Sequence, residues 1–187
     1  MKNPWIKCIS VLLCISLISG VLLTVLYYLL AVSAEERTMR AIKKIYGEEK
    51  TYSVILDIDG SDPETNTAIA YGDFGTINKI FLIGDKTADT YDLLFNATGE
   101  HGYKNGTITL WVQVNVSESG KKIEKVILES FTKQTLMSKL GSDFYDGFIG
   151  DVDGESRYTP VSGATYSSDA AANAINCVVQ YLRENAQ

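Results

Sequence analysis

The feature that most constrains this chain is an apolar run near its N-terminus, Cys8 to Ala34, which contains no charged residue. As a helix this run would be about 40 Å long, enough to cross a hydrocarbon core of about 30 Å. We therefore predict a short basic N-terminus over residues 1–7 and a single transmembrane helix over 8–34. A cleaved signal peptide is the alternative, because two lysines precede the run and small residues end it. Signal peptides, however, have apolar stretches of only about 7–15 residues.

The remainder of the chain is acidic and offers no pattern for a metal site. The chain has 17 Lys+Arg and 23 Asp+Glu, a net charge of −6, and setting aside Lys2 and Lys7 before the span leaves −8 for the rest. A domain this acidic is a poor nucleic-acid binder. Three Cys, one His and no CxxC pair argue against a metal cage, and Cys177 is expected to be a small buried residue. Basic residues flank both ends of the span, so charge leaves its orientation open.

A helical segment and then β-type residues follow the span. Between Glu35 and Glu49, apolar residues recur at helical spacing with charges between them. We expect this segment, 35–50, to be a helical stalk that extends the membrane helix, or else an amphipathic helix that packs on the domain. From residue 51 the residue types become β-branched and aromatic, which marks the start of a domain over 51–187.

The clearest strand runs from Thr107 to Val116, where apolar and polar side chains alternate. This period of two is typical of a strand with one face in the core. A turn at 117–120 and a second apolar stretch, Lys122 to Glu129, predict an antiparallel hairpin. Trp111 lies on the polar face of the first strand, where it could stack on an aromatic ligand or pack under a neighbouring loop. Further strands are expected at 51–58, 79–83 and 91–96.

Near the C-terminus, the small-residue turn Ser162-Gly163-Ala164-Thr165 is followed by Tyr166-Ser167-Ser168 and a helical pattern. Ser167 or Ser168 is predicted to cap that helix. Backbone N–H groups and the positive dipole end at a helix start favour a bound phosphate, so the turn is a candidate anion site, with a plain turn as the alternative. Apolar residues at helical spacing form one face of the helix: Ala171, Ala174, Ile175, Val178 and Leu182.

Together these features resemble the FMN-binding domain family. The resemblance rests on the apolar start around residues 17–23, on Gly102-Tyr103-Lys104-Asn105-Gly106 before the hairpin, and on residues 162–168 before the last helix. Within the family the chain is most similar to the G subunits of Rnf electron-transport complexes, and the C subunits of sodium-pumping NADH:quinone reductases are near relatives. The resemblance implies an α+β fold: a single N-terminal transmembrane helix and an extracytoplasmic FMN-binding domain with an antiparallel sheet and flanking helices.

In that family the last Thr of the Ser/Thr-Gly-Ala-Thr motif carries FMN through a phosphoester bond, and this residue is Thr165 here. A threonine hydroxyl is a weak nucleophile that needs outside activation, so a separate flavin transferase would attach the FMN. Gly163 and Ala164 would leave room for the phosphate, and N–H groups near Ser167 and Ser168 would bind its oxygens. The expected cofactor site is therefore Thr165 with Ser162, Gly163, Ala164, Ser167 and Ser168.

The chain also departs from the family pattern at two places. The family has Asp six residues before the modified Thr, where this chain has Thr159. Its Glu-Thr-Pro-Gly stretch after the hairpin is replaced by residues 132–137, from which only Thr135 is carried over as a flavin contact. Trp111 is the other additional candidate, as the ring that would stack on the flavin.

The resemblance implies a membrane-anchored flavoprotein subunit in a bacterial cell membrane, with its domain on the extracytoplasmic side. It would relay electrons through FMN in an ion-translocating complex that oxidises ferredoxin and reduces NAD, and would not be catalytic alone. Its partners would be the other membrane subunits, the flavin transferase and membrane lipid. Three alternatives remain: a C-type subunit of a sodium-pumping NADH:quinone reductase, a stand-alone extracytoplasmic FMN carrier, and a non-redox surface protein. Three sequons would suit the last, at Asn96, Asn105 and Asn115.

Overall fold

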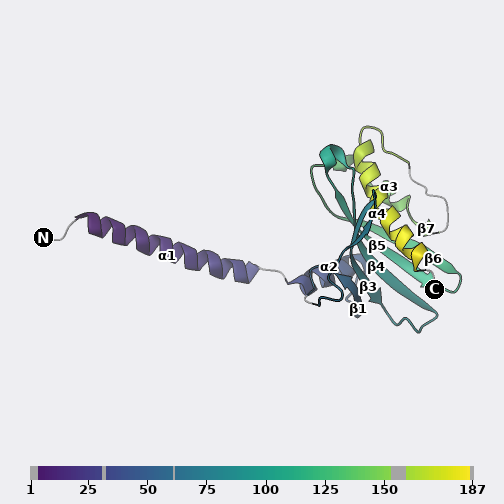
Figure 1. The fold of residues 1–187 in the computed structure, drawn as a ribbon, viewed down its shortest axis with the longest axis horizontal. Coiled ribbons are helices and arrows are strands. Elements are labelled where there is room, and N and C mark those ends of the chain that lie inside the picture. The colour runs from purple at the N-terminus through teal and green to yellow at the C-terminus, as the bar shows by residue number, and fades with distance from the viewer. Residues whose placement is uncertain (1–3, 31–32, 61, 153–158, 186–187) are drawn as a thin grey trace. The chain divides into compact units, whose positions relative to one another are not determined.

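The structure is a computed structural model that describes residues 4–30, 33–60, 62–152 and 159–185. The chain divides into two compact units, Met1–Arg37 and Thr38–Gln187. The first contains helix α1, Pro4–Leu30 (Figure 1), and its stretch Ile9–Leu26 is long and apolar enough to cross a membrane. The helix begins before the predicted 8–34 span, and residues 31–32 of that span lie outside the described residues.

The second unit is an α+β domain built on an antiparallel sheet (Figure 1). The strand order is β1-β3-β4-β5-β6-β7, with β2 paired to β3. The predicted strands near residues 51, 79 and 91 are confirmed, as is the hairpin of β5 and β6. The two unexpected strands, β2 and β7, are too short to show periodicity. The strands are β1 Tyr52–Asp57, β2 Ile69–Tyr71, β3 Gly75–Ile83, β4 Thr90–Gly99, β5 Ile108–Ser117, β6 Gly120–Phe131 and β7 Gly150–Asp151.

Helix α4, Thr165–Glu184, packs on one face of the sheet across β3, β4 and β5. All five apolar residues predicted to form its inner face are buried, and so is Cys177, where burial raises the pKa of the thiol to about 12. The helix comes very close to β4 at Gly99. A Cβ at Gly99 would lie 1.9 Å from the Ala170 carbonyl oxygen and 2.4 Å from the Ala174 nitrogen, so only glycine admits this packing.

Helix α2, Ala34–Tyr46, packs on the opposite face of the sheet through its residues after Arg37. Ile42 and Ile45 are buried against aromatic and aliphatic side chains of the central strands. Neighbouring strand residues confirm that the faces differ, because Leu94 belongs to this cluster and Phe95 to the cluster under α4. The Lys125 Nζ donates a hydrogen bond to the Ile45 carbonyl oxygen (2.6 Å). Of the two interpretations of residues 35–50, these contacts favour the amphipathic helix.

The face under α2 also carries buried polar side chains. Lys79 lies opposite Asn96, and Asn96 opposite Trp111, so the three share this face. The Lys79 Nζ lies 2.9 Å from a carboxylate oxygen of Asp57 and 2.8 Å from one of Asp59. Burial opposes the charge on Lys79, but the two carboxylates outweigh it and raise the pKa of Lys79. On this face, therefore, the buried ammonium of Lys79 is neutralised by the carboxylates of Asp57 and Asp59.

Short helical elements lie in the loop between β4 and β5 and in the segment after β6. They are the 3₁₀ turns η1, Tyr103–Asn105, and η2, Met137–Lys139, and the single helical turn α3, Ser142–Asp146. The loop around η1 and the segment between β6 and α3 both reach the start of α4, as the hydrogen bonds described below establish. They bring three separate parts of the sequence together at one place.

Candidate functional site

The chain enters α4 through a tight turn over residues 161–164. The Ala164 N–H donates a hydrogen bond to the Val161 carbonyl oxygen (2.8 Å), and Gly163 has φ +78°. A positive φ at the third residue of a turn is typical of type II and favours glycine. A Cβ at Gly163 would also lie 2.5 Å from the Lys139 Nζ. The turn thus requires glycine for its backbone, and it lies beside the ammonium group of Lys139.

The helix begins at Thr165 with Ala164 as the N-cap, whose side chain makes no capping hydrogen bond in the described part of the chain. The prediction that Ser167 or Ser168 is the cap is therefore wrong, because both serines lie inside the first turn and are buried. The Ser168 Oγ donates to the Ala164 carbonyl oxygen and accepts from the Val161 N–H, both at 3.1 Å. The Ser168 N–H also donates to the Ala164 oxygen (2.9 Å). Ser168 holds the turn together, and its N–H is already bonded rather than directed at a phosphate.

Gln134, which follows β6, links the first turn of α4 to the loop at η1. Its Oε1 accepts hydrogen bonds from the Ser167 Oγ (2.8 Å) and the Tyr103 N–H (3.2 Å). Its Nε2 donates to the Thr132 carbonyl oxygen (3.1 Å). The side chain is only 7% exposed, so these bonds form in a site where an unpaired amide would be costly. Gln134 therefore fixes the start of α4 against two other segments.

The loop at η1 can approach Gln134 because glycines flank it. A Cβ at Gly102 or Gly106 would lie 2.3 or 2.5 Å from the Gln134 Nε2. Between them, Lys104 and Asn105 have φ +52° and +56°, a conformation that costs a non-glycine residue on the order of 1 kcal/mol. The loop carries Tyr103, whose ring centroid lies 6.4 Å from that of Tyr166 at an interplanar angle of 54°.

The groups left exposed at the start of α4 are Ser162, Gly163, Thr165 and Tyr166. The N–H groups of the first helical turn point out of the helix end and carry its positive dipole. Together with the Lys139 ammonium, they form a set of donors suited to a phosphate diester. The residues present therefore fit the phosphate of an FMN attached to Thr165.

An open recess of ≈ 430 Å³ lies next to the turn. Thr159 and Lys139 both line this recess. Thr159 occupies the position at which the FMN-binding domain family has Asp. Asp143 of α3 lines the same recess. A carboxylate is thus present in the recess, although it comes from a different segment.

The structure does not bring Trp111 to this site. Its side chain is 5% exposed in the cluster under α2, and its ring stacks on Phe81 at 6.2 Å and 25°. Trp111 therefore lies on the face of the sheet opposite α4, where it is packed rather than free to stack on a ligand, but helix α2 covers it and not the loop that was expected. Thr135 is exposed and directly follows Gln134, which places it near the site without a contact that argues for a role.

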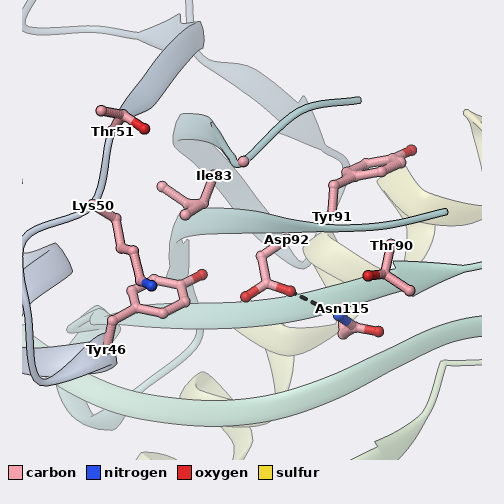
Figure 2. A pocket seen from close by; sticks show the side chains of 9 residues that line it. Tyr46, Lys50, Thr51, Ile83, Thr90, Tyr91, Asp92 and Asn115 are labelled. Carbon is pink, nitrogen blue, oxygen red and sulfur yellow. Dashed lines mark hydrogen bonds between the residues drawn. The ribbon is translucent and has the colours of Figure 1, made fainter. Parts of the chain in front are cut away.

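A second polar recess, of ≈ 290 Å³, lies where α2 ends on the sheet (Figure 2). The Asp92 carboxylate accepts hydrogen bonds from the Asn115 Nδ2 (2.9 Å) and the Gln113 Nε2 (2.8 Å). Among the described residues, the buried Tyr46 hydroxyl has no hydrogen bond of ordinary geometry. Burial, and then the charge of Asp92, raise the pKa of Tyr46. The Asp92 carboxylate is thus satisfied by neighbouring amides, whereas the Tyr46 hydroxyl beside it lacks a well-formed partner among the described residues.

Sequence reasoning missed Gln134, which bonds to Ser167 in the first turn of α4, and Lys139, which lies beside Gly163. The only sequence signal for Gln134 was the pair of glycines around η1, which showed that some group approaches closely without identifying it. Lys139 had no signal, because it is one lysine in an irregular segment.

In comparisons with known proteins, no family model matches the chain, and neither a curated protein nor a solved structure matches it.

Proposed function

We propose that this chain is a membrane-anchored flavoprotein subunit that carries FMN in phosphoester linkage on Thr165 and relays electrons within a membrane complex. Helix α1 would provide the anchor, since it is long and apolar enough to cross a membrane. The domain would lie outside the cytoplasm, and an Rnf-type, ion-translocating ferredoxin:NAD oxidoreductase is the assembly the sequence resembles. When bound, FMN would supply one-electron and two-electron transfer.

The observation that supports this proposal most is the contrast between Thr165 and its neighbours. Ser167, Ser168 and Gln134 are buried and hydrogen-bonded, whereas Thr165 is exposed on the first residue of the helix. An exposed hydroxyl on a fixed backbone is what a modifying enzyme needs. A threonine hydroxyl becomes a useful nucleophile only with outside activation, so the transferase would supply the base.

The attachment would be a transfer of FMN from an activated donor such as a flavin dinucleotide. The Thr165 Oγ would lose its proton and form a bond to the FMN phosphorus, while the pyrophosphate bond of the donor would break and the second nucleotide would leave. Lys139, beside Gly163, would offset the negative charge of the phosphate. Asp143, in the recess that Thr159 lines, would supply a carboxylate near the position where the family has Asp.

The test is co-expression of the full chain with a flavin transferase in cells, followed by denaturing gel electrophoresis and detection of flavin fluorescence on the polypeptide. The proposal expects a fluorescent band that Thr165→Ala abolishes and Ser162→Ala preserves. It also expects Thr159→Asp to increase the fraction labelled and Asp143→Asn to decrease it. A fluorescent band that survives Thr165→Ala, or an unlabelled wild-type chain, would overturn it.

The same experiment separates the alternatives. An unlabelled chain would favour a non-redox surface protein, although Asn96 of its three sequons is only 3% exposed and poorly placed for glycosylation. If the chain is labelled, co-purification of multi-span subunits after gentle membrane extraction would distinguish a complex subunit from a stand-alone FMN carrier. The identity of those subunits would distinguish an Rnf-type complex from a sodium-pumping NADH:quinone reductase.

A further inference from the structure

We propose that the exposed ring pair Tyr103–Tyr166 is the surface on which the isoalloxazine ring of the Thr165-linked flavin rests. This inference rests on the proposed function and goes beyond it, because it assigns the ring subsite to two residues that the phosphoester linkage does not involve. It also replaces Trp111, which is buried on the other face of the sheet.

Both rings are exposed, although aromatic side chains are usually largely buried in a folded domain. Tyr166 is 62% exposed, the highest value among the exposed large hydrophobic side chains of the described part of the domain, and Tyr103 is 37% exposed. Tyr166 directly follows Thr165 in the first turn of α4. FMN has only a short ribityl chain between its phosphate and its ring, so a ring carried on Thr165 must rest on nearby side chains.

The backbone segments that carry the two rings share one buried hydrogen-bond partner, Gln134. The Gln134 Oε1 accepts from the Tyr103 N–H and from the Ser167 Oγ, and so ties the backbone beside one tyrosine to the helix turn that bears the other. The loop of Tyr103 also holds three non-glycine residues at positive φ, His101, Lys104 and Asn105. Backbone strain of this kind persists only where surrounding contacts impose it, and it is concentrated at ligand sites.

The chemistry of the pair suits a flat, electron-poor ring. Tyrosine rings stack on aromatic ligands with offset or tilted geometry, and these two rings meet at an interplanar angle of 54° while both are exposed. The Lys104 Nζ lies 5.3 Å from the centroid of the Tyr103 ring. A cation over the Tyr103 ring would stabilise the additional negative charge of a reduced flavin bound beside it.

The test uses the flavin-loaded full chain, with loading measured independently by intact mass. A phenol close to a flavin quenches its fluorescence by electron transfer, so we expect the loaded wild-type protein to be several-fold dimmer than free FMN. Tyr103→Leu with Tyr166→Leu should restore most of the fluorescence. Tyr91→Leu is the matched control, because Tyr91 is at the opposite end of β4 from Gly99, and it should leave the fluorescence unchanged.

Conservative variants separate stacking from a general loss of structure. Tyr103→Phe with Tyr166→Phe keeps both rings but removes the phenols, so fluorescence should recover while the stacking shift of the visible flavin spectrum remains. If the protein is loaded but as bright as free FMN, or if the double leucine variant is as dim as the wild type, the inference is wrong while the proposed function survives. That outcome would leave the tyrosine pair as a contact for a protein partner. If no flavin is loaded, the proposed function fails, and this inference fails with it.

Discussion

The two faces of the sheet are both covered by a helix, yet they use their polar groups in different ways. Under α2, the polar groups pair with one another, as Lys79 does with Asp57 and Asp59. Under the start of α4, Ser168 bonds to the backbone of the turn and Ser167 to the Gln134 side chain, while Thr165 is exposed. If Thr165 carries FMN as proposed, the α2 face contributes to stability alone, whereas the α4 face also positions the attachment residue. Perturbing the first should change stability alone, and perturbing the second should also change flavin attachment.

The largest effect is expected from Gly99→Ala, which tests the packing of α4. Its Cβ would overlap backbone atoms of Ala170 and Ala174, so α4 would have to shift away from β4. We expect a loss of about 3 kcal/mol in unfolding free energy and a marked fall in flavin attachment, measured by urea denaturation and by intact mass. Gly141→Ala is the control, because a Cβ there meets nothing within 4 Å. Unchanged stability of Gly99→Ala would show that α4 does not pack as described.

Lys79→Met tests the opposite face, because methionine has a side chain of similar length to lysine but carries no charge. It leaves the buried Asp57 without its ion pair, which should cost about 3 kcal/mol, while flavin attachment should stay at the wild-type level. Lys43→Met is the control, since Lys43 pairs with Glu49 in exposed positions and should cost less than about 1 kcal/mol.

The pH dependence of the Lys79 contribution has a definite sign. The folded state raises the pKa of Lys79 above the usual 10.5, so folding favours the protonated form. The stabilisation is fully present below pH 10.5 and is lost as the pH rises through the higher folded value. The difference in stability between wild type and Lys79→Met should therefore be constant from pH 6 to 9 and shrink in alkaline solution. A difference that shrinks in acid only would contradict this assignment.

Gln134→Leu returns to the α4 face with a smaller expected effect. It leaves the Ser167 hydroxyl and the Tyr103 N–H without their partner, at a cost of about 2 kcal/mol. Because the start of α4 would lose its link to the loop, amide exchange in that loop should accelerate and flavin attachment should slow. The control is Thr135→Ala at the neighbouring exposed position. If Gln134→Leu were destabilised but labelled at the wild-type rate, the link would be structural only.

The smallest effect is expected from Tyr46→Phe on the α2 face. Within the described residues, the Tyr46 hydroxyl is buried without a well-formed hydrogen bond, and a buried polar group in this state is unfavourable. Removing it should raise the unfolding free energy by up to about 1 kcal/mol and leave flavin attachment unchanged. A clear loss of stability would show that the hydroxyl does bond to Asp92 in solution.

Much of the fold follows from local patterns in the sequence. The alternation in β5, the hairpin with β6 and the inner face of α4 were all predicted because each is written in neighbouring residues. The burial of Trp111 was not predictable in the same way, since the polar face of β5 becomes interior only when Ile42 and Ile45 of α2 cover it. The true N-cap of α4 was missed because Ser168 bonds back to Val161, a contact that depends on the fold of the turn.

In the candidate site too, features set by neighbouring residues were predictable, whereas contacts between distant segments were not. The motif from Ser162 to Ser168 could be located from its small residues and hydroxyls, but the side chains that fix it come from other segments. Gln134 and Lys139 reach the turn from the segment after β6, and Tyr103 reaches it from the loop before β5. Such contacts between distant parts of the chain carry no local sequence pattern, and only the assembled sheet brings them together.

The central claim is that Thr165 carries FMN, and the most direct measurement is peptide mass mapping of the full chain purified from cells that express a flavin transferase. The account predicts that the peptide containing residues 159–183 gains the mass of FMN less water, and that fragmentation places the added mass on Thr165. The absence of this mass from the peptide, or its location on Ser162, Ser167 or Ser168, would contradict the account.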